Sequence, residues 1–160
     1  MHLQRVDTTP GQDAFYQVPY RIYRDDPNWI PPLQRDLSFI FDEQRNPAFQ
    51  DGALQRWVLL DEEGQPAGRI AAFTKSEEVR NEPYRVGGIG FFECIHDQSG
   101  AFQLFDAAKQ WLEQQGIQAM DGPINFGERD KFWGLLVDGF KQPSYQENYN
   151  PPYYQELFEA

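Results

Sequence analysis

The chain has 160 residues, which is enough for one domain with a hydrophobic core and does not require a second domain. Its net charge of −11 argues against binding to nucleic acid or to an anionic membrane surface, and no apolar run is long enough to span a bilayer. One cysteine and two histidines argue against a metal site and exclude an internal disulfide, so a cytoplasmic location is expected.

The N-terminal half of the chain predicts a strand, two helices and a hairpin, in that order. The expected ranges are residues 2–7 for the strand, 14–23 and 33–41 for the helices, and 56–60 with 67–73 for the hairpin. Pro19 is expected to kink or shorten the first helix. Aromatic residues make up 16% of the chain, so they either fill an aromatic core or partly line an apolar groove or interface.

The C-terminal half predicts a strand, a helix, a second strand and a last short helix. The expected ranges are residues 87–95, 101–115, 117–126 and 152–160. Two strands joined by a helix of this length should lie parallel in one sheet, and the loop before the helix is a common ligand position. The predicted fold is therefore α/β, a mixed sheet that contains an antiparallel hairpin and a parallel pair, with helices on both faces.

This order of elements resembles the N-acetyltransferase fold of the GNAT superfamily. Several segments look closer still to one bacterial branch of that superfamily, namely residues 19–33, 68–72, 90–94, 122–125, 134–140 and 149–154. Members of this branch are usually longer, and the chain resembles their amino-terminal part. The resemblance implies a single GNAT-like domain over residues 1–160 in which the C-terminal strands of the family fold are absent.

The resemblance also implies an acyl-CoA site at the amino end of the long helix. GNAT members bind the pyrophosphate of acetyl-CoA with a Gln/Arg-x-x-Gly-x-Gly/Ala loop, and residues 96–101 stand at the matching positions. Ser99, Gly100 and Ala101 are therefore the predicted contacts to acetyl-CoA or another acyl-CoA. The loop is a degenerate version of the motif, because Asp97 brings a carboxylate to the place of the phosphate.

The strand before this loop carries the candidate catalytic residue, Glu93. In many GNAT enzymes this strand holds a general base for the attacking amine, and a carboxylate next to Phe91 and Phe92 can have a raised pKa. The alternative is a structural carboxylate that is hydrogen-bonded or faces solvent. Cys94 is expected to be a buried apolar residue rather than a nucleophile. Phe158, which has no hydroxyl, stands at the position of the acid tyrosine of GNAT enzymes.

Polar residues follow the second parallel strand, at the same end of the sheet as the 96–101 loop. Asn125, Glu128 and Arg129 are the predicted contacts to a small-molecule substrate in a pocket between the two loops. The equally economical alternative is a surface loop held by ion pairs that each contribute little.

Two functions of different classes follow from the sequence. The first is an acyl-CoA-dependent N-acyltransferase, and the second is a non-catalytic GNAT-like domain that binds a ligand or a partner chain. A homodimer is also expected, because an incomplete sheet leaves an edge to cover and apolar residues gather in the C-terminal third. These residues are Trp133, Leu135, Val137, Phe140, Tyr145, Tyr149, Tyr153 and Tyr154.

Overall fold

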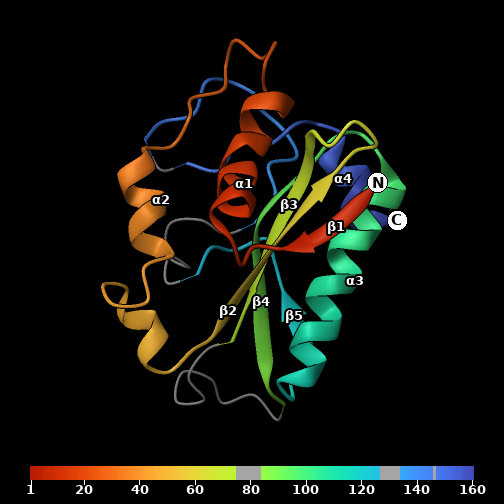
Figure 1. Ribbon diagram of the computed structural model, residues 1–160. Helices are drawn as coiled ribbons and strands as arrows, with labels where there is room; N and C mark the ends of the chain where they lie inside the picture. Colours follow the sequence, from red (N-terminus) through yellow and green to blue (C-terminus); the bar gives the residue numbers. More distant parts are fainter. Residues whose placement is uncertain (75–83, 127–133, 146) are drawn as a thin grey trace.

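The core of the molecule is a five-stranded mixed sheet in the order β1-β2-β3-β4-β5 (Figure 1). The computed structural model describes residues 1–74, 84–126, 134–145 and 147–160. The strands are β1 (His2–Arg5), β2 (Leu54–Leu60), β3 (Pro66–Phe73), β4 (Val86–Cys94) and β5 (Ala119–Asp121). Neighbouring strands from β1 to β4 are antiparallel, whereas β4 and β5 are parallel. The predicted α/β fold, with a hairpin and a parallel pair, is confirmed.

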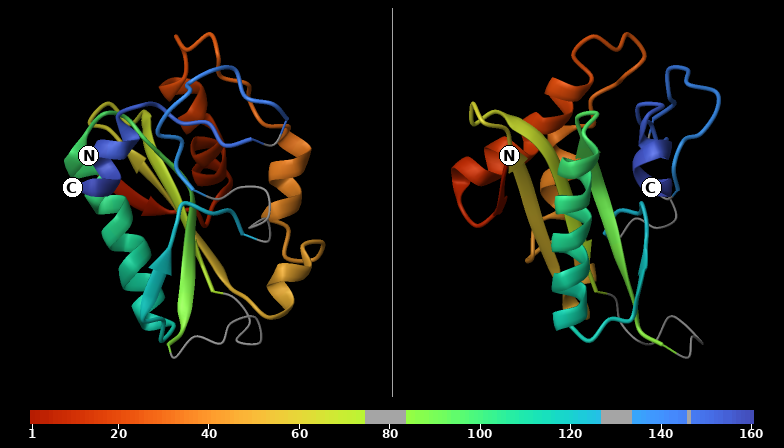
Figure 2. Two further views of the ribbon diagram at one scale, coloured as in Figure 1. Left: turned by 180° about the vertical axis from the view of Figure 1, so that it is seen from behind. Right: turned by 90° about the vertical axis from the view of Figure 1, so that its right-hand side faces the viewer.

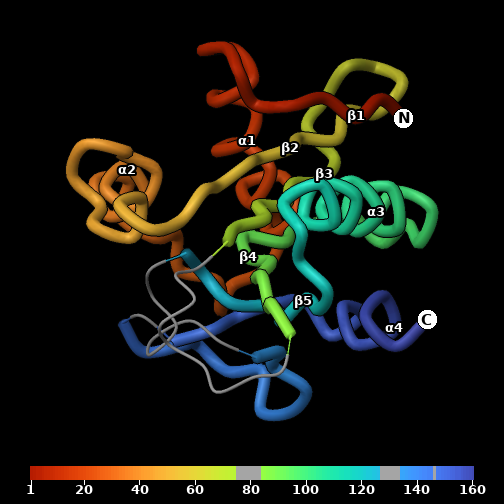
Figure 3. The backbone as a smooth tube through the Cα atoms, turned by 90° about the horizontal axis from the view of Figure 1, so that it is seen from below, coloured from red at the N-terminus to blue at the C-terminus, as the bar shows by residue number. Residues whose placement is uncertain are grey.

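Helices cover both faces of this sheet. They are α1 (Thr9–Ile22), α2 (Gln34–Ile40), α3 (Gln98–Gln114) and α4 (Tyr154–Glu159), with a short 3-10 helix, η1 (Pro47–Gln50). α1 and α2 lie on one side of the sheet and α3 lies on the other (Figure 3). Accordingly, Phe15 of α1 packs in one hydrophobic cluster with Phe73, and Leu104 of α3 packs in a second cluster with Ile70. The last part of the chain passes beyond β5, beside the parallel edge of the sheet (Figure 2).

A bulge in β4 decides which face each of its last side chains occupies. Phe91 has a φ of 52°, and the register with β3 shifts between Arg69 and Ala71. One extra residue reverses the alternation of side chains beyond it. Phe91 therefore packs on the α1 face. Glu93 lies on that same face, directly opposite Arg69.

The strand–helix–strand unit differs from the prediction at its boundaries. α3 begins at Gln98 rather than at residue 101, because the Asp97 side chain caps its first turn. β5 has three residues rather than the predicted range 117–126, since the Gly122–Pro123 peptide follows it and proline has no N–H for a ladder. The parallel pairing is confirmed, but it covers only residues 86–88 of β4 and not the length of the predicted strand 87–95.

α1 continues through Pro19 to Ile22, so the predicted shortening of this helix is wrong. Proline has no N–H to donate to the carbonyl four residues earlier, which is that of Phe15. Nη1 of Arg69 donates to this carbonyl instead, at 3.3 Å. The helix tolerates Pro19 because an arginine from the sheet supplies the missing donor.

Candidate functional site

β4 and β5 separate halfway along β4, and side chains bridge the gap between them. Beyond residues 86–88, the Ile124 N–H donates to the Ile89 carbonyl at 2.8 Å. The Phe91 N–H donates to Oδ1 of Asn125 at 3.2 Å. Asn125, a predicted substrate contact, therefore hydrogen-bonds the bulge of β4 with its side chain.

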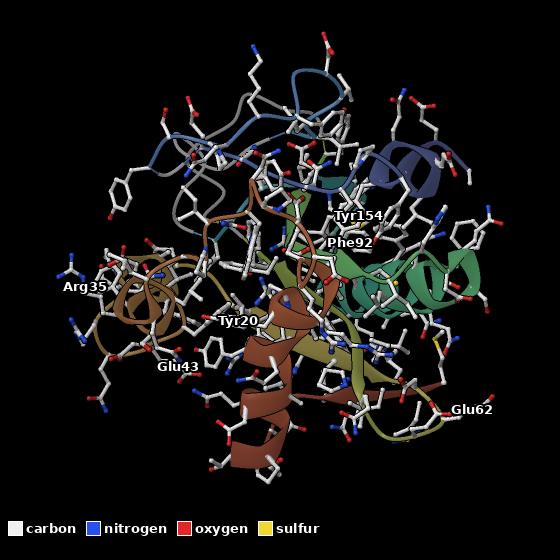
Figure 4. The ribbon with its side chains drawn as sticks, turned by 90° about the horizontal axis from the view of Figure 1, so that it is seen from above. Tyr20, Arg35, Glu43, Glu62, Phe92 and Tyr154 are labelled. Carbon is white, nitrogen blue, oxygen red and sulfur yellow. The ribbon has the colours of Figure 1, made fainter. Side chains whose placement is uncertain are left out.

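The end of β4 is held by two tyrosines from the start of α4. Tyr153 donates its hydroxyl to the Cys94 carbonyl at 2.7 Å, and the hydroxyl of Tyr154 accepts the Cys94 N–H at 2.9 Å. The Tyr154 ring also meets the Phe92 ring edge-on at 5.2 Å, and the two side chains lie next to each other in Figure 4. At this end of β4, side chains provide the hydrogen bonds that β5 provides at the other end.

Glu93 is the centre of a buried polar cluster built from four segments of the chain. Tyr154 and Tyr23 both donate to its Oε2, at 2.6 Å and 2.9 Å. Nη2 of Arg69 lies 3.6 Å from its Oε1. The Arg69 and Glu93 side chains are only 5% and 12% exposed. Oε2 thus has two short hydrogen bonds, while the longer contact to Arg69 leaves Oε1 with capacity to accept another proton.

Burial shifts the pKa values of this cluster away from their ordinary ranges. Removal from water raises the pKa of Glu93, although Arg69 and the hydroxyls of Tyr154 and Tyr23 oppose that rise. Burial, together with the Glu93 charge, raises the pKa of both tyrosines well above 10. The tyrosines therefore stay protonated as donors, and Glu93 is a better proton acceptor than an exposed carboxylate.

The cluster lies at a cavity of about 390 Å³, a volume within the range of small-molecule sites. Glu93 and Arg69 are its buried charged residues. Apolar side chains from the α1–α2 connection, α2 and the C-terminal segment form most of the remaining wall, among them Trp29, Ile30, Leu33, Leu37, Leu135 and Phe158. Ile30 and Leu33 are also about half exposed, so the apolar wall continues to the surface. This arrangement suits an amphiphile with a polar head and an apolar tail.

Arg69 and Tyr23 are the residues of this site that the sequence reasoning missed. Arg69 interrupts an otherwise apolar strand, and its guanidinium lies 5.0 Å from the centre of the Phe15 ring. Its Nε has no hydrogen-bond partner among the described residues. A charged residue within a run of small apolar ones was the available signal. Tyr23 ends α1, where its ring stacks on Trp29 at 4.8 Å, and no pattern in the sequence marked it.

The predicted acyl-CoA contacts lie in the first turn of α3. The Gly100 N–H donates to Oδ1 of Asp97 at 2.6 Å, so a carboxylate already takes one of the N–H groups that would face a phosphate. A Cβ at Gly100 would lie 2.9 Å from Leu59 Cδ2 and 3.0 Å from Met1 Sδ, so this glycine is enclosed by the protein. Ser99 and Ala101 follow the same helical turn. At this turn, the Asp97 carboxylate accepts an N–H that the resemblance assigns to the diphosphate of an acyl-CoA.

The Cys94 thiol and the His96 ring are not part of this polar cluster. Glu128 and Arg129 lie outside the described residues. Burial raises the pKa of the Cys94 thiol to about 12, which makes it a poor nucleophile. The His96 ring stacks on Tyr153, and its Nε2 is 3.3 Å from Oε2 of Glu156. Within the described ranges, no group of three or more histidine, cysteine or acidic residues could hold a metal ion.

Solved structures share this fold at low sequence identity. An acetyltransferase from Trypanosoma brucei superimposes with a TM-score of 0.51 and 15% identity, over 86% of this chain and 96% of that one. A tetramutant of a Bacillus halodurans protein superimposes with a TM-score of 0.50 and 12% identity, over 82% and 88% of the two chains. The chain therefore shares its fold with these solved structures, among them an acetyltransferase, and the predicted mixed sheet with helices on both faces is the fold they have in common.

Two curated proteins are similar to the chain in sequence, although no family model matches it. Protein YghO of Escherichia coli K12 is 35% identical over 132 residues, which are 81% of this chain and 33% of that protein. A bacterial ceramide synthase of Caulobacter vibrioides is 32% identical over 141 residues, which are 86% of this chain and 36% of that protein. The chain thus spans about a third of the length of these relatives. None of the helices in the described part of the chain is long and apolar enough to cross a membrane.

Proposed function

We propose that this chain is a domain of an N-acyltransferase and binds a long-chain amine, with the amino group at Glu93 and the alkyl chain along the apolar wall. The observation that carries the proposal is a buried carboxylate with a raised pKa beside an otherwise largely apolar cavity. The similarity to a bacterial ceramide synthase supports it, because a ceramide is an N-acylated long-chain amine. The activity of the longer relatives is extended to this chain only as part of this proposal.

Glu93 would act as the proton acceptor in the transfer. When the amine nitrogen attacks an acyl thioester, a C–N bond forms, the thiolate leaves, and the nitrogen must lose a proton. Tyr23 and Tyr154 occupy Oε2 of Glu93, so Oε1 would take that proton. Arg69 beside Oε1 disfavours a second positive charge, and this favours the neutral, nucleophilic form of the amine.

The acyl donor that the resemblance implies is an acyl-CoA, with Ser99, Gly100 and Ala101 at its diphosphate. For this chain the donor remains a prediction, since the Asp97 carboxylate occupies the first turn of α3. Asn125 is retained as a contact that shapes the cavity, which it lines, while Glu128 and Arg129 remain predicted substrate contacts. A cytoplasmic location likewise stays a prediction.

The Asp97 cap on the first turn of α3 favours a second function, which is binding without catalysis. A GNAT-like domain that binds an amphiphile without transferring an acyl group needs the cavity but no donor site. The Asp97–Gly100 hydrogen bond, which closes the predicted donor position, supports this alternative.

An assay of product formation separates the two functions. The protein would be incubated with decylamine and a decanoyl thioester, and the amide would be quantified by mass spectrometry. The proposal predicts N-decyldecanamide above the uncatalysed background for the wild type and about a hundredfold less for Glu93→Gln. Glu113→Gln, on the exposed side of α3, is the matched control and should behave as the wild type. Binding of decylamine without any amide would support the second function and contradict the first.

We also propose that the chain forms a homodimer through its C-terminal third. Val137 and Tyr145 are 57% and 70% exposed, which supports an apolar contact surface. Tyr154 is only 2% exposed, so part of the predicted surface is already packed within one chain. Light scattering at several protein concentrations should give twice the monomer mass, and Tyr145→Glu should restore the monomer. A monomer at all concentrations would contradict this proposal.

A further inference from the structure

The first turn of α3 carries its own anion. An α-helix of 17 residues presents unpaired N–H groups and the positive end of its dipole at its start, which attracts phosphates. In this chain, Oδ1 of Asp97 accepts the Gly100 N–H at 2.6 Å, and the Asp97 carbonyl accepts the Ala101 N–H at 3.0 Å. The Asp97 carboxylate thus accepts an N–H that the oxygen of a bound phosphate would otherwise accept.

The residue before the cap, His96, is already engaged by its neighbours. His96 precedes the cap, and its ring nitrogen is already paired with the Glu156 carboxylate. Tyr153 covers the other side of the imidazole by stacking, with 4.5 Å between the ring centres. Gly100 is enclosed by Leu59 and Met1. A diphosphate at this turn would therefore meet the Asp97 carboxylate, and the ring of the preceding His96 is already paired with Glu156.

We propose that Asp97 is a built-in occupant of the anion position of α3 and excludes the diphosphate of a nucleotide thioester from it. The domain would consequently bind an acyl thioester with no contribution from the diphosphate. The exclusion is a property of this turn alone. The statement about the thioester rests on the acyltransferase function proposed above.

Two probes that differ only in the nucleotide part test this inference. Decanoyl-CoA carries the diphosphate, whereas S-decanoyl-pantetheine lacks it and the adenosine. For the wild type, equilibrium binding should give dissociation constants that agree within about threefold, because the diphosphate makes no favourable contact. Asp97→Gly removes the anion and frees the Gly100 N–H, and glycine is tolerated at this cap. This variant should bind decanoyl-CoA about tenfold more tightly than the wild type does, with S-decanoyl-pantetheine unchanged.

Two further variants make the result specific. Asp97→Asn keeps the cap and removes the charge, so its gain should be smaller than that of Asp97→Gly. Asp106→Asn removes the same charge from the exposed middle of α3 and should leave both dissociation constants unchanged. Inorganic pyrophosphate should compete with decanoyl-CoA in Asp97→Gly only. Thermal unfolding of each variant confirms that the fold is intact.

The outcomes separate this inference from the proposed function. A wild type that binds decanoyl-CoA about tenfold more tightly than S-decanoyl-pantetheine would overturn the exclusion, as would an unchanged affinity in Asp97→Gly. If the wild type binds neither probe and Asp97→Gly binds decanoyl-CoA, the exclusion stands and the acyltransferase function fails for this chain.

Discussion

The two halves of β4 differ in what bonds their outer edge. At residues 86–88 the backbone of β5 lies alongside and the strands pair in register. Around Phe91 and Cys94, the amide of Asn125 and the hydroxyls of Tyr153 and Tyr154 take over that role. The first half is a regular part of the sheet. The second half is hydrogen-bonded by side chains instead of a neighbouring strand, and the cavity lies beside it.

This difference explains why the candidate site lies where it does. Backbone pairing with β5 fills the space beside residues 86–88, and none of these residues lines the cavity. Where β5 turns away, the cavity of about 390 Å³ opens, and the bulge at Phe91 brings Glu93 to its side. Single substitutions should therefore affect the second half of β4 more specifically than the first.

The largest effect is expected for Glu93→Ala. This change leaves Arg69 buried without its carboxylate, and an unpaired buried charge costs about 3–5 kcal/mol of the free energy of unfolding. Urea denaturation provides the measurement. The double variant Arg69→Leu/Glu93→Leu removes both charges and should recover most of the loss, because an apolar pair can replace a buried ion pair. Additive losses in the double variant would contradict the account of the cluster.

A glycine comparison between the two halves of β4 should give the next largest effect. A Cβ at Gly90 would run into the backbone carbonyl of Ile124, so Gly90→Ala must displace the backbone that follows β5 away from β4 and should cost about 3 kcal/mol. A Cβ at Gly88 would meet the ring of Phe73, which is a side chain and can shift, so Gly88→Ala should cost about 1 kcal/mol. Chemical denaturation of both variants checks the order. A larger loss for Gly88→Ala would show that the gap is not bridged as described.

Removing the hydroxyl of Tyr154 should lower the free energy of unfolding more than removing that of Tyr153, the N-cap of α4. Tyr154→Phe removes a donor to the charged Glu93 and an acceptor for the Cys94 N–H, so it should lower the free energy of unfolding by about 2–3 kcal/mol. Tyr153→Phe removes one bond to a neutral carbonyl and should cost about 1 kcal/mol. Equal losses of stability in the two variants would contradict a stabilising hydrogen bond from Tyr154 to the Glu93 carboxylate.

The smallest effect is a dependence of stability on pH. Because burial raises the pKa of Glu93 above the ordinary value of 4.5, the folded protein keeps a proton that the unfolded chain has already lost. This contribution is complete below pH 4.5 and is lost as the pH rises through the raised pKa, with a slope of at most about 1.4 kcal/mol per pH unit. Denaturation of wild type and Glu93→Gln across this range should show that stability falls more with rising pH in the wild type than in the variant. Parallel curves would contradict the raised pKa.

The order of elements could be predicted from the sequence because it depends on local patterns. Alternation, helical spacing and the glycines and prolines between them are sufficient for the sheet and its helices. The strand that carries Glu93 was also predicted correctly, as residues 87–95. The sequence pattern predicts the start of α3 three residues late. Asp97 is the N-cap of this helix and not part of a longer loop.

The face on which Glu93 lies could not be predicted, because it depends on the bulge at Phe91. A regular strand would have placed Glu93 on the same face as Ile89, towards α3. Arg69 and Tyr23 become part of the site only through that reversal and through the Phe15 carbonyl that Pro19 leaves free. These are tertiary effects between residues far apart in the chain, and no single stretch of sequence carries them.

The binding of a series of straight-chain amines tests the central claim most directly. Calorimetric titration from butylamine to dodecylamine, with wild type and Glu93→Gln, measures the contributions of chain and head group together. The account predicts that affinity rises with each added methylene by up to about 0.8 kcal/mol until the cavity is filled, and that Glu93→Gln weakens every member by about tenfold or more. An affinity that is independent of chain length, or equal for the two proteins, would contradict the assignment of this cavity to a long-chain amine.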